Sequence, residues 1–212
     1  MAALAVSRVT WPPLGHAGPM ARPELWLCRH GETEWSRDGR HTSRTDLPLM
    51  PKGGEQARRL RSRLSGVAFD VVLTSPRRRS VDTAALAGFP NTAVEPAAEE
   101  WDYGEFEGLT TPAIREKDPG WTVWTHPVPG GETAEQVGAR ADRVIDRVQR
   151  EARTRALLFS HGHFLRVLAA RWIEQTPTAG AHLVLDTGTV SVLGWERETP
   201  ALLHWNDTGR LD

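Results

Sequence analysis

The chain has 212 residues, of which 39% are hydrophobic and 25% charged, and its formal net charge is −1. These values suit one globular domain with a large core, and they exclude a global basic field for nucleic acid or anionic lipid. No apolar run approaches the length of a membrane span. The sole cysteine, Cys28, rules out a disulfide within the chain and fits a reducing compartment, so we expect a cytoplasmic protein.

Residues 1–22 differ in character from the rest of the chain. They contain Pro12, Pro13 and Pro19 and no sustained apolar segment, unlike a signal peptide. We expect a disordered leader, with Met20 as an alternative start. Residues 23–206 are then expected to form one domain and 207–212 a tail.

Strand and helix patterns alternate along the expected domain. Short apolar runs predict strands over 24–28, 69–74, 156–160, 190–195 and 201–205, the last two near a sheet edge. Helical spacing of apolar residues predicts helices over 54–64, 77–87, 134–148 and 164–173. This alternation predicts a three-layer α/β/α sandwich around a mostly parallel mixed sheet.

Two segments interrupt the alternation. Residues 34–51 show neither the helical nor the strand spacing of apolar residues, and they are expected to be a loop on the side of the functional site. Residues 99–131 are rich in aromatic and turn residues, and 105–131 are expected to make a short excursion over the site.

Three of the predicted strands end in polar residues. The first delivers Arg29 and His30, the second Ser75 with Arg79 one helical turn later, and the third His161. If these strands are parallel neighbours, their carboxyl ends meet at one rim of the sheet, where ligands of open α/β sheets bind. Two arginines and two histidines around one point predict a pocket for a compact dianion.

Phosphoryl transfer is the chemistry that these residue types favour. A neutral imidazole such as that of His30 is nucleophilic near neutral pH, and Arg29, Arg79 and His161 could stabilise the charge on the transferred oxygens. One carboxyl group could protonate the leaving alkoxide and later deprotonate water. From spacing alone, the candidates for this group are Glu99, Glu100, Asp102, Glu105 and Glu107. Nothing in this scheme requires a metal.

Four ordered motifs make the sequence similar to a known family. Residues 27–33 (LCRHGET), 75–84 (SPRRRSVDTA), 100–108 (EWDYGEFEG) and 160–162 (SHG) resemble the signatures of the histidine phosphatase superfamily, which includes the cofactor-dependent phosphoglycerate mutases. The resemblance implies a phosphoglycerate mutase-like fold and a phosphohistidine intermediate. It implies no cofactor and no metal.

The resemblance also implies the roles of individual residues. The implied catalytic residues are the nucleophile His30, the proton donor Glu100, and His161, Arg29 and Arg79. The implied substrate-binding residues are Arg29, Ser36, Thr42, Ser43, Arg79, Tyr103, His161 and Gly162. The expected partner is a small phosphorylated substrate, with a second copy of the chain as a further candidate and neither nucleic acid nor membrane.

Departures from the mutase pattern favour hydrolysis. Mutases of this family carry asparagines where this chain has Ser36 and His163, and residues 105–131 contain only Arg115 and Lys117 as cations. Residues 99–104, the tryptophans before Gly130 and residues 160–163 look closer to broad-specificity acid phosphatases and sedoheptulose-bisphosphatase-like enzymes. The resemblance therefore implies a phosphatase, a hydrolase acting on phosphomonoesters of small metabolites, with sugar phosphates as candidates. The alternatives are a cofactor-dependent phosphoglycerate mutase and a non-catalytic phosphoester-binding module.

Other conspicuous residues have simpler interpretations. We expect Arg77 and Arg78 to be exposed helix residues, and Cys28 to be a small buried hydrophobic residue. His161 and His163 lack further ligands at metal-site spacing. We expect Trp35, Trp101, Trp121 and Trp124 to be packing residues of the excursion rather than platforms on which a sugar stacks.

Overall fold

The computed structural model describes residues 22–209, so most of the expected leader and the last three residues lie outside the described residues. Within this range one mixed sheet has the strand order β3-β2-β4-β1-β5-β6. The strands are β1 (Glu24–Arg29), β2 (Val71–Thr74), β3 (Ala93–Val94), β4 (Arg155–Ser160), β5 (Val190–Glu196) and β6 (Thr199–Asp207). The four strands from β3 to β1 are parallel to one another, and β5 is antiparallel to both of its neighbours, β1 and β6.

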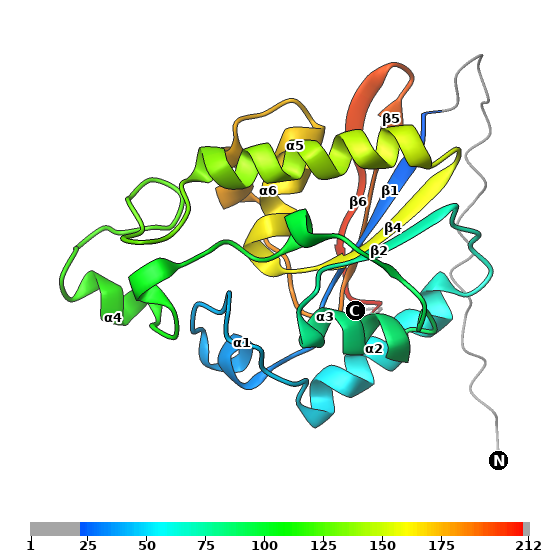
Figure 1. Ribbon diagram of the computed structural model, residues 1–212. Coiled ribbons are helices and arrows are strands. Elements are labelled where there is room, and N and C mark those ends of the chain that lie inside the picture. Colours follow the sequence, from blue (N-terminus) through cyan, green and yellow to red (C-terminus); the bar gives the residue numbers. More distant parts are fainter. Residues whose placement is uncertain (1–21, 210–212) are drawn as a thin grey trace.

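Helices cover both faces of the sheet (Figure 1). One face carries α2 (Pro51–Leu64) and α3 (Arg78–Leu86), and the other carries α5 (Ala134–Glu151) and α6 (Gly162–Trp172). Two short helices, α1 (Glu34–Asp38) and α4 (Thr111–Arg115), lie beyond one end of the sheet. Three 3-10 segments lie at Pro96–Ala98, Gly104–Phe106 and Pro177–His182. This is the three-layer α/β fold that the sequence predicted.

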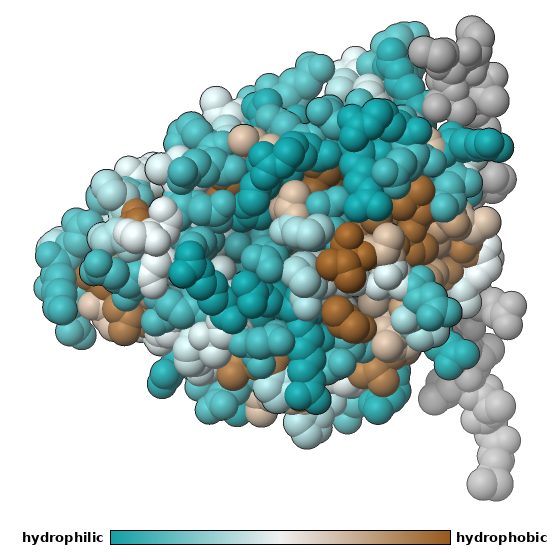
Figure 2. Space-filling view, in the orientation of Figure 1, coloured by the Kyte–Doolittle hydropathy of each residue, from teal (hydrophilic) through white to brown (hydrophobic). Residues whose placement is uncertain are grey.

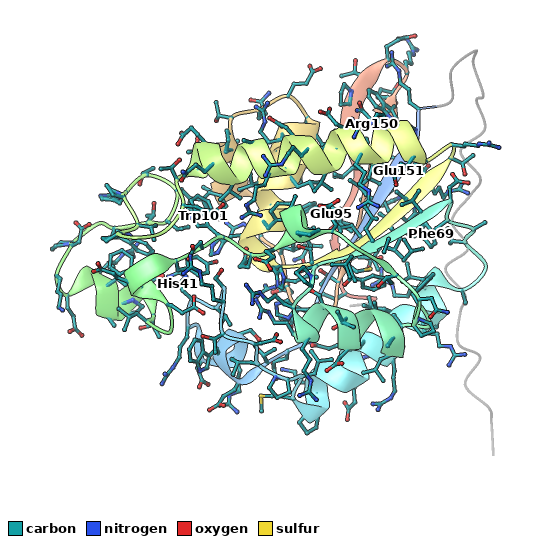
Figure 3. All side chains as sticks on the ribbon, in the orientation of Figure 1. His41, Phe69, Glu95, Trp101, Arg150 and Glu151 are labelled. Carbon is teal, nitrogen blue, oxygen red and sulfur yellow. The ribbon has the colours of Figure 1, made fainter. Side chains whose placement is uncertain are left out.

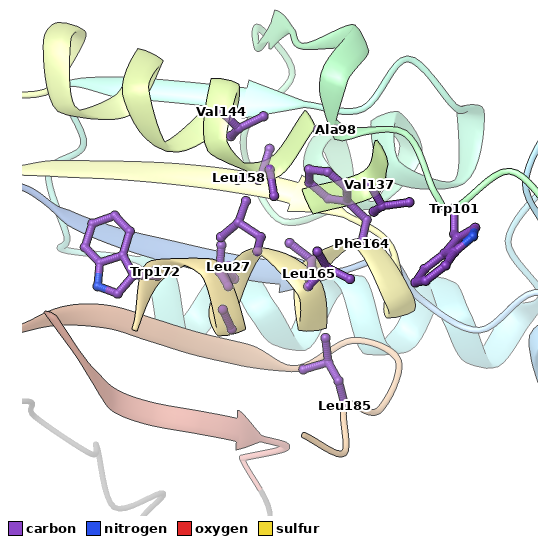
Figure 4. Packing of buried hydrophobic residues seen from close by; sticks show 14 of the residues in the cluster. Leu27, Ala98, Trp101, Val137, Val144, Leu158, Phe164, Leu165, Trp172 and Leu185 are labelled. Atoms are coloured by element: carbon purple, nitrogen blue, oxygen red, sulfur yellow. The ribbon is translucent and has the colours of Figure 1, made fainter. Parts of the chain in front are cut away.

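Strand β1 lies at the centre of the sheet and faces two cores. Leu25 and Leu27 belong to the cluster on the side of α5 and α6, part of which Figure 4 shows with Leu27 labelled. Trp26 and Cys28 belong to the cluster on the side of α2 and α3. A strand buried on both faces gives a continuous apolar run in the sequence rather than an alternating one. Burial raises the pKa of the Cys28 thiol to about 12, so this side chain packs as a neutral apolar group.

The order of the central strands brings three strand ends together. Cys28 of β1 and Thr74 of β2 both pair with Phe159 of β4. Because the three strands are parallel and adjacent, the residues that follow them leave the sheet at one edge. The predicted convergence of the three polar strand ends is therefore confirmed.

A one-turn helix, α1, lies where the sequence predicted a loop. The Thr33 hydroxyl accepts a hydrogen bond from the backbone N–H of Ser36, and the Ser36 hydroxyl accepts one from that of Thr33. Gly39, at φ 71°, ends the helix in the left-handed conformation. The prediction over 34–51 was wrong here because five residues are too few to show a helical period, although their reciprocal cap holds them. Asp207, expected in the tail, is the last residue of β6.

The outer surface is largely polar. Figure 2 shows a mainly hydrophilic face on which apolar residues form smaller groups. In the described range 22–209, no helix combines the length and apolar character needed to cross a membrane.

Two glycines set the position of the turn after β1. A Cβ on Gly31 would overlap the carbonyl of Gly53, and a Cβ on Gly53 would overlap the backbone of Glu32. Helix α2 therefore begins in direct backbone contact with the turn that carries His30. This approach requires glycine at both positions, because any side chain would push the helix away from the turn.

Two neighbouring glycines in α2 give a matched stability prediction. Gly53→Ala places a methyl group against backbone that cannot move aside, so we expect a loss of about 1–3 kcal/mol in the free energy of unfolding. At Gly54 the nearest atom to an added Cβ is Arg58 Nη1 at 3.5 Å, so Gly54→Ala should be neutral or stabilise the helix by up to about 1 kcal/mol. Chemical denaturation measures both variants, and equal effects would contradict the close approach.

Candidate active site

A cavity of about 240 Å³ opens at the edge where the three strands end. Seven of the residues predicted from sequence line it: Arg29, His30, Ser36, Thr42, Glu100, Tyr103 and Gly162. The lining residues that sequence did not assign to the site are Thr33, Gly39, Arg40, His41, Thr111, His163, Arg166 and Leu185. Figure 3 shows His41 and Trp101 toward the α4 end of the molecule, far from Arg150 and Glu151.

His30 lines the cavity with only 5% of its surface exposed. Its Nδ1 lies 2.8 Å from the carbonyl oxygen of Gly31. Since a carbonyl only accepts, Nδ1 carries the hydrogen and Nε2 keeps a free lone pair. Burial, together with Arg79 and Arg29, holds the pKa of His30 well below its ordinary value. The imidazole is therefore neutral and nucleophilic at neutral pH.

Arg79 and His161, both predicted as site residues, are completely buried next to His30 and are not among the residues that line the cavity. Arg79 donates from Nε to His161 Nδ1 at 3.2 Å. This bond leaves the proton of a neutral His161 on Nε2, which donates to the Ser75 hydroxyl at 2.7 Å. The His161 ring is 5.2 Å from the His30 ring, centroid to centroid, and burial and Arg79 hold its pKa well below the ordinary value.

Arg29 approaches the same point from β1. Its Nη1 donates to the carbonyl of Leu185, and its Nε is buried without a hydrogen-bond partner among the described residues. An added Cβ on Gly162 would lie 3.1 Å from the Arg29 Cζ, so the glycine makes room for the guanidinium. A buried donor without a partner is costly unless a ligand supplies the acceptor.

The two arginines carry uncompensated positive charge. In residues 22–209, neither Arg29 nor Arg79 forms an ion pair with a carboxylate, although Arg77, Arg140 and Arg147 do. Burial lowers the pKa of both Arg29 and Arg79, and the more distant Glu100 partly opposes this effect. An anion placed between them would be strongly attracted.

Glu100 is held at the start of α6. Its Oε1 accepts from the backbone N–H groups of Trp101 at 2.9 Å and Phe164 at 2.8 Å, and its Oε2 accepts from that of His163 at 3.0 Å. A carboxylate at a helix N-terminus satisfies donors that the helix itself leaves free. Oε1 is fully used, so Oε2 is the oxygen with a position left for another partner.

Neutral ring side chains form the outer wall of the cavity. The Tyr103 hydroxyl lies 2.6 Å from His163 Nδ1, and the His41 ring is 4.6 Å from the Tyr103 ring. Burial raises the pKa of Tyr103 well above its usual value and lowers that of His41 to about 4. The pKa of His163 is also lowered, mainly by burial. Tyr103 therefore donates to His163, and these three rings carry no charge at neutral pH, whereas Arg40 and Arg166 add cations to the same lining.

The serine and threonine side chains predicted to bind substrate have less direct access to the cavity. Ser36 and Thr42 line the cavity, but their hydroxyls already donate to the carbonyls of Thr33 and Arg40. Ser43 is buried outside the lining, with its hydroxyl 3.5 Å from the Glu100 carbonyl.

The prediction that Arg77 is an exposed helix residue was wrong. Arg77 precedes α3 and is partly buried, because it donates to the carbonyl of Arg44 at 3.1 Å and to Glu99 Oε2 at 3.2 Å. Arg78 is exposed as predicted.

The tryptophans divide into buried and partly exposed side chains. Trp101 and Trp121 are buried in the core, as expected for packing residues. Trp124 lies beneath the Arg166 guanidinium, 4.6 Å from the ring centroid, and Trp35 lies against Gly108. Among residues 22–209, no three His, Cys, Asp or Glu side chains are grouped as metal ligands would be.

A neutral imidazole beside two arginines that have no carboxylate partner among residues 22–209, with a fixed carboxyl group in the same cavity, is the arrangement expected of an enzyme that handles a phosphate dianion. The chain belongs to the histidine phosphatase superfamily (branch 1), whose family model matches residues 25–208. As the sequence predicted, it is thus a phosphatase of this metal-independent superfamily.

Individual relatives are consistent with this assignment. An acid phosphatase from Mycobacterium tuberculosis is 43% identical over 188 residues, covering 87% of this chain and 93% of that protein. A sedoheptulose 1,7-bisphosphatase from Saccharomyces cerevisiae is 34% identical over 186 residues, covering 73% of this chain and 69% of that protein. A solved structure of an open reading frame product from Mycobacterium tuberculosis has a TM-score of 0.84 at 40% identity and covers 89% of this chain and 99% of its own.

The protonation state of His30 can be measured directly. Because its pKa is lowered, the imidazole should stay neutral, with hydrogen on Nδ1, as the pH falls from 8 through the ordinary histidine value of about 6.5. Nitrogen-15 NMR of histidine-labelled protein, assigned with His30→Gln, reports both the charge and the tautomer. Arg79→Met removes a nearby positive charge and should raise the His30 pKa. A half-protonated His30 at pH 6.5 in the unsubstituted protein would contradict this account.

Proposed function

We propose that the protein hydrolyses phosphomonoesters of small metabolites through a phosphohistidine on His30. The observation that carries this proposal is the neutral, buried His30 imidazole beside the partly buried Arg29 and the buried Arg79, neither of which pairs with a carboxylate within residues 22–209. A substrate phosphate would supply the acceptor that Arg29 Nε lacks. It would also supply the negative charge that both guanidinium groups lack.

In the first step, His30 Nε2 attacks phosphorus and forms the N–P bond while the ester P–O bond breaks. Arg29 and Arg79 stabilise the charge on the transferred oxygens. The leaving alkoxide takes a proton from Glu100 Oε2, the carboxyl oxygen with a free position. The product alcohol then leaves.

In the second step, the Glu100 carboxylate takes a proton from water as the water oxygen attacks phosphorus. The N–P bond breaks, inorganic phosphate forms, and His30 returns as a neutral imidazole. Glu100 is again protonated, so the two steps together consume one water and balance. The three N–H groups that hold Glu100 keep the same oxygen facing the reaction in both steps.

Substrate size and polarity follow from the rest of the cavity. Its volume of about 240 Å³ suits a small metabolite, and its wall offers the neutral ring groups of His41, Tyr103 and His163. Such a wall suits a leaving group with hydroxyls, and a sugar phosphate is the candidate that we favour. The name of the yeast relative, a sedoheptulose 1,7-bisphosphatase, supports a phosphorylated sugar.

Hydrolysis and its intermediate give the direct test. The purified protein should release phosphate from p-nitrophenyl phosphate in EDTA, and His30→Gln should abolish both turnover and acid-labile labelling by a radioactive phosphoester. Glu100→Gln should lower kcat by about 10²–10⁴-fold for substrates with poor leaving groups, because proton transfer is lost. Unchanged activity in His30→Gln would disprove the phosphohistidine.

A substrate panel separates hydrolysis from mutase chemistry. Residues 105–131 contain only two cations, and Arg115 donates from Nε to the carbonyl of Trp121. This segment therefore offers little to retain a bisphosphorylated intermediate. Conversion of 3-phosphoglycerate in the presence of 2,3-bisphosphoglycerate should be slower than hydrolysis of sugar phosphates. The opposite order would favour a mutase, and phosphate binding without any turnover would favour a binding module.

A further inference from the structure

The loop after His41 holds the Arg79 guanidinium through backbone carbonyls. Arg79 Nη1 donates to the carbonyl of Thr45 at 3.1 Å, and Nη2 donates to those of Thr42 and Ser43, both at 3.2 Å. The orientation of this buried cation therefore depends on the loop keeping three carbonyl groups turned inward.

These contacts leave one donor of Arg79 available. A guanidinium has five N–H donors in a fixed plane. One donates to His161 and three to the loop carbonyls, so a single N–H on Nη1 remains for a ligand. A small rotation of the plane would redirect that donor, because the fork is rigid.

Glu107 holds the other side of the same loop. The backbone N–H of Ser43 lies 3.0 Å from Oε1 and 2.9 Å from Oε2, and that of Thr45 lies 3.0 Å from Oε1. The N–H groups of this loop thus face Glu107, while the carbonyls of the same residues face Arg79. In residues 22–209, Glu107 forms no ion pair within 4 Å that would give it another structural role.

We propose that Glu107 is a positioning residue that fixes the loop at 42–45 and thereby aims Arg79 at the phosphoryl group. The inference rests on the proposed role of Arg79 in binding phosphate. The segment after Tyr103 would thus hold the 42–45 loop in place. Two backbone hydrogen bonds next to Glu107 strengthen this contact: Gly108 N–H donates to the His41 carbonyl at 2.8 Å, and His41 N–H donates to the Leu109 carbonyl at 2.9 Å.

A carboxylate suits this position better than an amide. Both oxygens of Glu107 accept from the Ser43 N–H, and Oε1 also accepts from that of Thr45. In Glu107→Gln one of these oxygens becomes an NH₂ group, which cannot accept. The glutamine variant should therefore keep part of the loop geometry, whereas Glu107→Ala removes all of it.

The first experiment compares Glu107→Ala and Glu107→Gln with Glu105→Ala. Glu105 is exposed two residues away, so its replacement removes the same charge without touching the loop. We measure kcat and KM for p-nitrophenyl phosphate, the inhibition constant of inorganic phosphate, and Tm. Glu107→Ala should lower kcat/KM and weaken phosphate inhibition by about tenfold each, since a misaimed group loses much of its effect. Glu107→Gln should fall between, and Glu105→Ala should stay within about twofold of the unsubstituted enzyme.

A double-mutant cycle with Arg79→Lys shows whether Glu107 acts through Arg79. In the Arg79→Lys background the planar fork is gone, so adding Glu107→Ala should lower kcat/KM by less than about threefold. The inference would be overturned if the losses in kcat/KM caused by Arg79→Lys and Glu107→Ala multiplied in the double variant. It would also be overturned if Glu107→Ala behaved like Glu105→Ala. If Arg79→Lys itself leaves phosphate inhibition and kcat/KM unchanged, the proposed role of Arg79 in binding phosphate fails and the inference with it, whereas the phosphohistidine is tested separately by His30→Gln.

Unfolding of the alanine variant is a separate outcome. Where Glu107→Ala lowers Tm so far that the protein is unfolded at the assay temperature, Glu107→Gln takes its place in the cycle. A folded Glu107→Gln enzyme with unsubstituted kcat/KM and phosphate inhibition would also overturn the inference.

Discussion

Buried positive charge without a carboxylate partner is the constraint on which the site depends. Taking a guanidinium out of water is expensive, and proteins usually offset the cost with a paired carboxylate. Arg140 and Arg147 follow that rule here, with Glu132 and Glu95 as partners. Arg29 and Arg79 instead receive only backbone carbonyls and an imidazole, so a charge remains for the ligand to neutralise.

The same constraint explains the state of the histidines. Two nearby cations and burial disfavour an imidazolium, so His30 and His161 are held neutral. A neutral His30 can act as a nucleophile. Its hydrogen bond to the Gly31 carbonyl keeps the hydrogen on Nδ1 and leaves the free lone pair on Nε2. For His161 neutrality means that one nitrogen accepts from Arg79 while the other donates to Ser75. Burial and the nearby cations therefore both prepare the proposed attacking atom of His30 and let His161 support the Arg79 guanidinium.

Sequence predicted the fold and the convergence of three polar strand ends because strands and helices leave local patterns in the sequence. β1 and β4 appear as apolar runs, and the residues after them reach one rim through the parallel order of the strands. Helix α1 was missed because a five-residue helix depends on its cap rather than on a period. His41 was missed for a different reason: nothing beside it in sequence suggests a site. It reaches the cavity only because its backbone pairs with Leu109 and its ring packs on Tyr103.

Helix α6 connects Glu100, the proposed proton donor, to the ring side chains that line the cavity. The backbone N–H of His163 donates to Glu100 Oε2, while the side chain of the same residue accepts from the Tyr103 hydroxyl. A leaving group that displaces the His163 ring would therefore also disturb the first turn of the helix that fixes the carboxyl group. Because α6 buries its apolar residues beneath α5, that turn has little freedom to move. In the proposed mechanism, recognition of the leaving group and its protonation consequently depend on one rigid helix start, so a poorly fitting alcohol would be both badly bound and badly protonated.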